Sequence, residues 1–309
     1  MKEYLVGYTG FVGSNLAYEH EFNGLYNSKN IADAFGGHPD LLVYAGLPAE
    51  MFLANQAPEK DYQRIEQAMA NIEAIHAKTV VLISTVAVYP DTRGADENTV
   101  IDETRLPAYG ANRLALERWV EQNCPRHLIV RLPAIYGKNL KKNFIYDLIH
   151  VIPALLTEKK LAELSNQVPQ LREYYINQNN GFYKCRPLDS AGESQLKAWF
   201  QKLEFSALNF TDSRSRYQFY SLGRLWKDIQ TALVNGLQRI NLVTPPISAA
   251  ELHQELTGKP FVNELDKPPY DYDLRTKFSD YYMSSNGYII NKKQELDNVF
   301  QYVKSVTIK

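Results

Sequence analysis

A tyrosine and an arginine one helical turn apart are the residues of this chain best suited to proton transfer. Tyr109 and Arg113 bound the segment YGANR, and on a helix residues four positions apart share a face. A cation in that position favours the phenolate, so we expect it to lower the tyrosine pKa from its usual value of about 10. Tyr109 could then pass a proton to or from a substrate oxygen.

Two hydroxyl side chains precede this segment. Ser84 and Thr85 directly follow the run Val80–Ile83, whose β-branched residues are typical of a buried strand. In an open parallel sheet, the carboxyl ends of the strands face the crevice in which ligands bind. We therefore expect Thr85 to orient a substrate hydroxyl or carbonyl group.

Glycines at a spacing of three residues predict a phosphate-binding turn near the first residue. The run GYTGFVG covers residues 7–13 and follows a short apolar segment. Glycine lets the chain turn tightly between a strand and a helix, whose first N–H groups and positive dipole end favour an anion. Such glycines also occur in turns for packing reasons alone, which is the alternative here. The residues expected to contact a cofactor are Gly7, Thr9, Gly10, Phe11, Val12 and Gly13.

The elements that must position these residues alternate between strand and helix. Apolar runs at 41–45, 80–83 and 128–132 predict buried strands. Helical spacing of apolar residues predicts helices over 61–76 and 109–122, and the helix after the first strand is expected to be short. This alternation predicts the α/β class, with a doubly wound parallel Rossmann sheet.

The pattern weakens beyond about residue 137. Residues 158–215 mix charged, aromatic and amide side chains without a clear period. A strand over 217–222 and a helix over 225–233 follow, and a capping-box pattern predicts a helix over 248–256.

Two domains are expected from this change of pattern. Residues 1–145 would form a dinucleotide-binding Rossmann domain, completed by about 216–235. Residues 146–309 would form mainly a smaller, partly irregular lobe that binds the substrate.

Several motifs make the chain resemble the extended short-chain dehydrogenase/reductase superfamily, in particular its NAD-dependent epimerase/dehydratase branch. They are GYTGFVG, STVAVY at 84–89, the acidic pair at 102–103, YGANR, and RLPAIYG at 131–137. The resemblance covers about residues 1–145. It implies an enzyme, an oxidoreductase or epimerase, that binds NAD or NADP and commonly acts on a nucleotide sugar.

The catalytic residues that the resemblance implies are Thr85, Tyr109 and Arg113. Tyr109 falls at the general acid/base, and Arg113 at a lysine that bonds the nicotinamide ribose and lowers the tyrosine pKa in the family. Arginine keeps the charge but has a wider, planar head, so the replacement is not conservative. Alternatively, Arg113 could pair with Glu117 on a solvated helix face. The departure leaves a second hypothesis open: a catalytically silent dinucleotide-binding or regulatory protein.

The stretch 25–30, expected to contain the end of the second strand, bears on the choice of cofactor. NAD-binding members usually carry an acid there, which holds the ribose diol, whereas this chain has Asn27, Ser28 and Lys29. Ser28 and Lys29 could accept a 2′-phosphate, which slightly favours NADP over NAD. Alternatively, this is a polar loop without a ribose contact.

Weaker candidates complete the expected site. The other residues expected against the cofactor lie at strand ends: Ala45, Gly46, Leu47, Ser84 and Pro133. Asn143 lies where the family holds the substrate diphosphate, and Arg216 resembles the family's diphosphate-binding arginine. A solvated basic loop is the alternative for the region around Asn143.

Composition excludes some classes of partner. Lys and Arg number 34 against 35 Asp and Glu, a formal net charge of −1, so bulk attraction to nucleic acid or a membrane surface is not expected. No apolar run is long enough to span a membrane, and the two cysteines form no metal-binding spacing. We expect a cytoplasmic protein without a metal, whose family often forms homodimers.

Overall fold

The computed structural model describes residues 1–307, which separate into two compact units. The first comprises Met1–Leu140, Arg216–Ile247 and Asp271–Tyr302. The second contains Lys141–Ser215, Ser248–Tyr270 and the described chain from Val303. The first boundary lies near the expected residue 145, but the segments that complete the first unit extend well beyond the expected 216–235.

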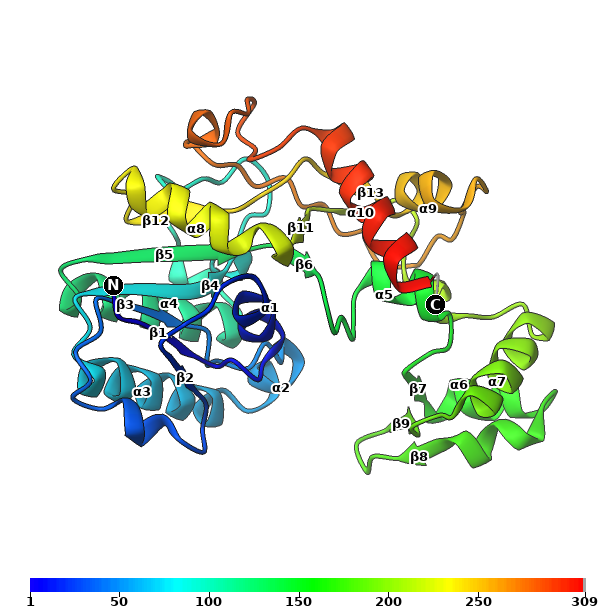
Figure 1. Cartoon of the computed structure of the whole chain (residues 1–309). Helices are drawn as coiled ribbons and strands as arrows, with labels where there is room; N and C mark the ends of the chain where they lie inside the picture. Colours follow the sequence, from blue (N-terminus) through cyan, green and yellow to red (C-terminus); the bar gives the residue numbers. More distant parts are fainter. Residues whose placement is uncertain (308–309) are drawn as a thin grey trace. The chain divides into compact units, whose positions relative to one another are not determined.

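A parallel sheet forms the centre of the first unit (Figure 1). Within residues 1–307 its six strands are β1 (Glu3–Val6), β2 (Gly24–Tyr26), β3 (Leu41–Tyr44), β4 (Thr79–Thr85), β5 (His127–Leu132) and β12 (Arg239–Asn241). The spatial order is β2-β1-β3-β4-β5-β12, and all neighbours are parallel. The predicted doubly wound parallel sheet is confirmed. β2 and β3 flank β1 on opposite sides, so the order in which successive strands are added across the sheet reverses there. Ligands bind at such a switch point in doubly wound sheets.

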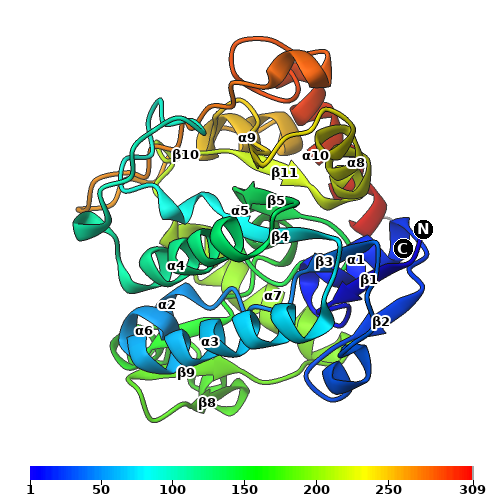
Figure 2. The same cartoon turned by 90° about the vertical axis from the view of Figure 1, so that its left-hand side faces the viewer.

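Helices cover both faces of this sheet (Figures 1 and 2). They are α1 (Phe11–Glu19), α3 (Pro58–Ile75), α4 (Ala108–Asn123) and α8 (Leu225–Val234). Successive strand residues point to opposite faces. Leu5 therefore packs in the core with α1 and α8, and its neighbour Val6 in the core with α3 and α4. The helices predicted over 61–76 and 109–122 are confirmed, and α1 is short, as expected.

Shorter elements complete the first unit. They are η1 (Ile31–Ala34), α2 (Met51–Gln56), η2 (Val86–Val88), η3 (Glu103–Arg105), β6 (Ala134–Tyr136), β10 (Arg216–Tyr217), β11 (Phe219–Ser221), η6 (Leu222–Arg224) and η7 (Ser279–Tyr282). The longer helix α10 (Lys292–Thr307) begins in the first unit, which ends at Tyr302, and its last residues belong to the second unit. The strand expected over 217–222 is divided into β10 and β11. Gln218 lies between them, and its buried amide donates to the carbonyl oxygens of Thr244 and Leu274.

The second unit is smaller but more regular than expected. Its elements are α5 (Phe144–His150), β7 (Leu155–Thr157), α6 (Glu158–Ser165), η4 (Pro169–Tyr174), β8 (Tyr175–Asn177), β9 (Phe182–Cys185), α7 (Ser190–Lys202), η5 (Ala207–Phe210) and α9 (Ala249–Thr257), with β13 (Ile247–Ser248) at its edge. The antiparallel sheet β7-β9-β8 shares an apolar core with α6 and α7. Residues 158–215 therefore contain several helices and strands, although their sequence shows no clear period. At the predicted capping box, the Ser248 hydroxyl caps α9 by accepting a hydrogen bond of 3.0 Å from the Glu251 N–H.

Candidate active site

The glycine-rich turn joins β1 to α1 under tight steric constraint. Gly7 has a φ of +91°, and a Cβ there would lie 2.4 Å from the Ala45 carbonyl oxygen. A Cβ on Gly13 would lie 2.1 Å from the Gly7 oxygen. Both glycines are therefore required by the close packing of the turn against itself and against the end of β3.

The start of α1 has the features of an anion site. Gly10 is its N-cap, and no side chain of residues 1–307 caps the helix or places an acid in its first turn. The first N–H groups of a helix have no partner within it, and Thr9 and Gly10 are exposed while Phe11 and Val12 are half-buried. A pyrophosphate fits this glycine cradle, because no Cβ or acidic group occupies it.

Replacing Gly13 with alanine tests this packing. We expect Gly13→Ala to lower the free energy of unfolding by about 2–3 kcal/mol, because the new Cβ overlaps backbone atoms that cannot move away. Gly10→Ala is the matched control, since its Cβ would meet the Gly7 oxygen at 3.2 Å. Urea unfolding measures both, and equal stability of the two variants would contradict the packing argument.

The loop expected to contact the adenosine ribose directly follows β2. The Asn27 side chain accepts from the Lys29 N–H at 2.9 Å, and the Asn30 side chain accepts from the Asn27 N–H at 2.8 Å. These bonds fix the shape of the loop. Ser28 and Lys29 remain exposed at its tip, so of the three predicted residues these two have side chains that could reach a phosphate.

The three residues predicted to be catalytic are brought together. Tyr109 and Arg113 lie on the first turns of α4, and the Arg113 Cζ lies 4.5 Å from the centre of the Tyr109 ring. Thr85 ends β4, and its Oγ1 accepts from the Ala87 N–H at 3.1 Å. Burial raises the pKa of Tyr109; Arg113 and the Thr85 hydroxyl act in the opposite direction, while the Asp61 charge adds to the rise. The expectation of a lowered Tyr109 pKa is therefore wrong, because burial outweighs the cation.

Arg113 does not pair with Glu117. Its Nη1 donates to Asp61 Oδ2 at 2.9 Å, and its Nη2 donates to Asp61 Oδ1 at 3.1 Å and to the Pro48 oxygen at 2.8 Å. Arg113 and Asp61 are each 4% exposed. The alternative of a surface pair with Glu117 is therefore wrong, because Arg113 forms a buried ion pair between α4 and α3.

Glu117 instead belongs to a buried polar network under the end of β4. It accepts from Arg131 Nη2 and from the Ser84 hydroxyl, each at 2.5 Å. Arg131 also donates to the Tyr89 hydroxyl at 2.6 Å. Adjacent residues of a strand face opposite sides of the sheet, so Ser84 and Thr85 cannot both point to the same face. The Ser84 hydroxyl was predicted to lie against the cofactor, but it is bonded to Glu117 within the core.

The remaining cofactor candidates lie at strand ends. Ala45 extends the β3 ladder, with its N–H bonded to the Val6 oxygen at 2.9 Å. Gly46 is exposed, Leu47 is half-buried, and Pro133 is half-buried between β5 and β6. Their small or apolar surfaces fit a cofactor that passes over the edge of the sheet.

The two substrate candidates have structural partners of their own. Asn143, in the second unit, is the N-cap of α5 with a φ of +117°, and its side chain accepts from the Tyr146 N–H. Arg216, in the first unit, forms ion pairs with Asp271 at 3.2 Å and Asp273 at 4.0 Å. These acids offset the charge with which Arg216 would attract a diphosphate.

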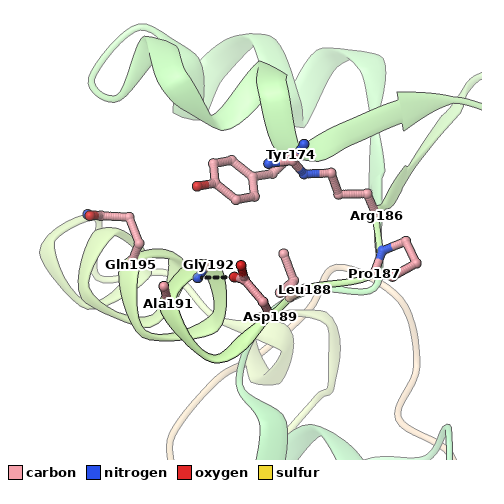
Figure 3. Close-up of a pocket in the computed structure, with 8 residues that line it drawn as sticks. All are labelled: Tyr174, Arg186, Pro187, Leu188, Asp189, Ala191, Gly192 and Gln195. Carbon is pink, nitrogen blue, oxygen red and sulfur yellow. Dashed lines mark hydrogen bonds between the residues drawn. The ribbon is translucent and has the colours of Figure 1, made fainter.

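A separate cavity of about 510 Å³ lies within the second unit (Figure 3). It includes none of the predicted site residues; its lining is Tyr174, Arg186, Pro187, Leu188, Asp189, Ala191, Gly192 and Gln195. The Arg186 guanidinium lies 4.5 Å from the Tyr174 ring centre. The Asp189 carboxylate accepts from the Gly192 N–H at 2.7 Å and caps α7, so the helix N-terminus there already holds a negative group.

Within residues 1–307, no group of three or more His, Cys, Asp or Glu side chains could hold a metal ion. No described helix is both long and apolar enough to cross a membrane. The two cysteines, Cys124 and Cys185, are free.

One family model matches the chain. It is described as the RmlD substrate-binding domain and covers residues 1–163, just over half of the 309 residues. A search of curated proteins found no match.

Solved structures match over nearly the whole chain at low identity. A hypothetical dTDP-4-dehydrorhamnose reductase from Sulfolobus tokodaii is 18% identical (TM-score 0.58, 93% of this chain and 97% of that chain). The dTDP-4-dehydrorhamnose reductase of Bacillus anthracis, in complex with NADP, is 15% identical (TM-score 0.64, 98% and 99%). UDP-glucose 4-epimerase of Thermotoga maritima, with UDP-glucose, is 12% identical (TM-score 0.57, 99% and 99%). At these identities, the similarity concerns the fold.

Proposed function

The chain belongs to the RmlD substrate-binding domain family, and on that premise we propose that it is an NADP(H)-dependent oxidoreductase that reduces a carbonyl group of a nucleotide sugar. The observation that carries the proposal is the meeting of Tyr109, Thr85 and Arg113 beside the carboxyl end of β4. A phenol and an alcohol at the crevice of a doubly wound sheet can together bind one oxygen atom and give it a proton.

The nucleotide part of the proposal depends on the β1–α1 turn. The glycine cradle and the uncapped start of α1 would hold the pyrophosphate. Ser28 and Lys29 would hold the 2′-phosphate of NADP, since the loop directly after β2, residues 27–30, contains no acid. Of the three solved structures described above, one contains NADP and one UDP-glucose, which supports a nucleotide cofactor and a nucleotide-sugar substrate.

Each catalytic side chain has a distinct task in this proposal. When bound, the cofactor supplies the hydride. Thr85 bonds the substrate carbonyl oxygen and orients it, and Tyr109 gives its hydroxyl proton to that oxygen as the carbonyl becomes an alcohol. Arg113 holds one face of the Tyr109 ring.

Steady-state kinetics test the proposal. The purified protein is mixed with NADPH and, in turn, dTDP- and UDP-linked keto sugars, and absorbance at 340 nm is followed. We expect oxidation of NADPH that depends on the sugar nucleotide. Tight NADPH binding without turnover on any of these sugars would favour the silent dinucleotide-binding protein, and sugar interconversion without net NADPH oxidation would indicate an epimerase.

The preference for NADP gives a prediction of its own. We expect Lys29→Ala to weaken NADPH binding by about 5–10-fold, because a charge-assisted bond to the 2′-phosphate is lost, and to leave NADH binding unchanged. Calorimetric titration with both coenzymes measures this. Lys78→Ala, which removes another exposed lysine, is the control, and equal loss of affinity for NADPH and NADH in Lys29→Ala would contradict a 2′-phosphate contact.

A further inference from the structure

The cation beside Tyr109, Arg113, is paired with a carboxylate, that of Asp61. Asp61 on α3 binds both terminal nitrogens of Arg113, at 2.9 and 3.1 Å, and both side chains are 4% exposed. A second donor, the Asn112 amide, reaches the same carboxylate at 2.9 Å. The carboxylate is thus fully engaged in the core between α3 and α4.

These contacts fix the position of the guanidinium group. Two carboxylate oxygens and the Pro48 carbonyl define its plane, and bidentate pairs of this kind have a specific geometry. The group is therefore held with its Cζ 4.5 Å from the Tyr109 ring centre. A lysine at position 113 would lack the planar fork that matches this carboxylate.

We propose that Asp61 is a positioning residue that orients Arg113 and neutralises its charge, so that Tyr109 stays protonated and acts as the proton donor in carbonyl reduction. The role of Tyr109 as proton donor rests on the proposed function. The effect of Asp61 on the protonation of Tyr109 does not. In the reduction, the carbonyl carbon gains the hydride and the carbonyl oxygen gains the Tyr109 proton. The resulting phenolate then takes up a proton from solvent.

The charged and polar groups around Tyr109 come from four elements of the first unit. Arg113 faces it from α4, Asp61 from α3 and the Thr85 hydroxyl from β4. From α2, the neutral Asn55 side chain accepts from the Tyr109 backbone N–H at 2.9 Å. The exposed Arg64 acts on Asp61, whose pKa is lowered although burial raises it, because Arg113 and Asn112 bind its ionised form. Asp61 is therefore the anion that balances Arg113 at this site.

Nuclear magnetic resonance of protein labelled with ¹³C at the tyrosine Cζ tests the proposal without substrate. The Tyr109 signal is assigned by its absence in Tyr109→Phe and followed against pH. We expect Asp61→Asn to lower the Tyr109 pKa by about one pH unit, since the cation is then unbalanced. The control, Glu59→Gln, removes an exposed acid from the first turn of the same helix and should leave the Tyr109 titration unchanged.

A double variant covers the case in which Asp61→Asn fails to fold. Asp61→Asn combined with Arg113→Met removes both charges, and we expect its Tyr109 pKa to lie close to that of the wild type. An unchanged Tyr109 titration in folded Asp61→Asn would overturn the proposal, as would a large shift in the double variant. Because the titration needs no turnover, a protein that reduces no sugar but shows these shifts would refute the proposed function and leave the role of Asp61 standing.

Discussion

Replacing Tyr109 with phenylalanine is expected to lower kcat for nucleotide-sugar reduction by about 10²–10⁴-fold, the usual contribution of a positioned general acid. The change removes only the hydroxyl group and keeps the ring on which Arg113 lies. NADPH affinity and the unfolding midpoint should therefore remain those of the wild type. Single-turnover kinetics at saturating NADPH measure the chemical step.

A second tyrosine provides the control for this prediction. Tyr62 lies on α3 and is 40% exposed, and Tyr62→Phe also removes one hydroxyl group. We expect it to keep wild-type kcat. If Tyr109→Phe kept a similar rate, another group would have to donate the proton.

The second large effect concerns stability. Arg131→Met is expected to lower the free energy of unfolding by about 3–5 kcal/mol, because it leaves a buried carboxylate without its cation. Arg131 and Glu117 are each 1% exposed in their side chains, and they are joined by bonds from Nε and Nη2. Denaturant unfolding, monitored by tryptophan fluorescence, measures the loss.

Two further variants distinguish the loss of a buried ion pair from the loss of any surface charge. Arg118→Met breaks an exposed pair with Glu103, whose side chains are 46% and 51% exposed, and should cost less than about 1 kcal/mol. Arg131→Met with Glu117→Leu removes both buried charges and should recover part of the lost stability. A loss in Arg131→Met no greater than in Arg118→Met would show that the buried pair is not strongly stabilising.

Local patterns predicted much of the first unit. Apolar runs identified β3, β4 and β5, and helical spacing of apolar residues identified α3 and α4, because each pattern reflects which faces are buried. The predicted superfamily, and with it an enzyme fold, is confirmed by the family match over residues 1–163. β12 was missed because a three-residue strand carries too little pattern.

Long-range polar pairs could not be predicted in the same way. The Asp61–Arg113 pair joins residues 52 positions apart on two different helices, and no spacing rule relates them. Tyr109 was correctly placed beside Arg113, but the sign of its pKa shift depends on burial and on Asp61, which only the packed structure reveals. The short strands of the second unit escaped prediction for the same reason as β12.

The central claim, hydride transfer to a nucleotide sugar, is tested most directly with isotope. The protein is incubated with NADPH that carries one deuterium at C4, prepared separately as each of the two C4 stereoisomers, and with a nucleotide-linked keto sugar. Mass and nuclear magnetic resonance spectra of the product should show deuterium on the former carbonyl carbon from one stereoisomer alone. Product without deuterium from either stereoisomer, or no product at all, would contradict the account.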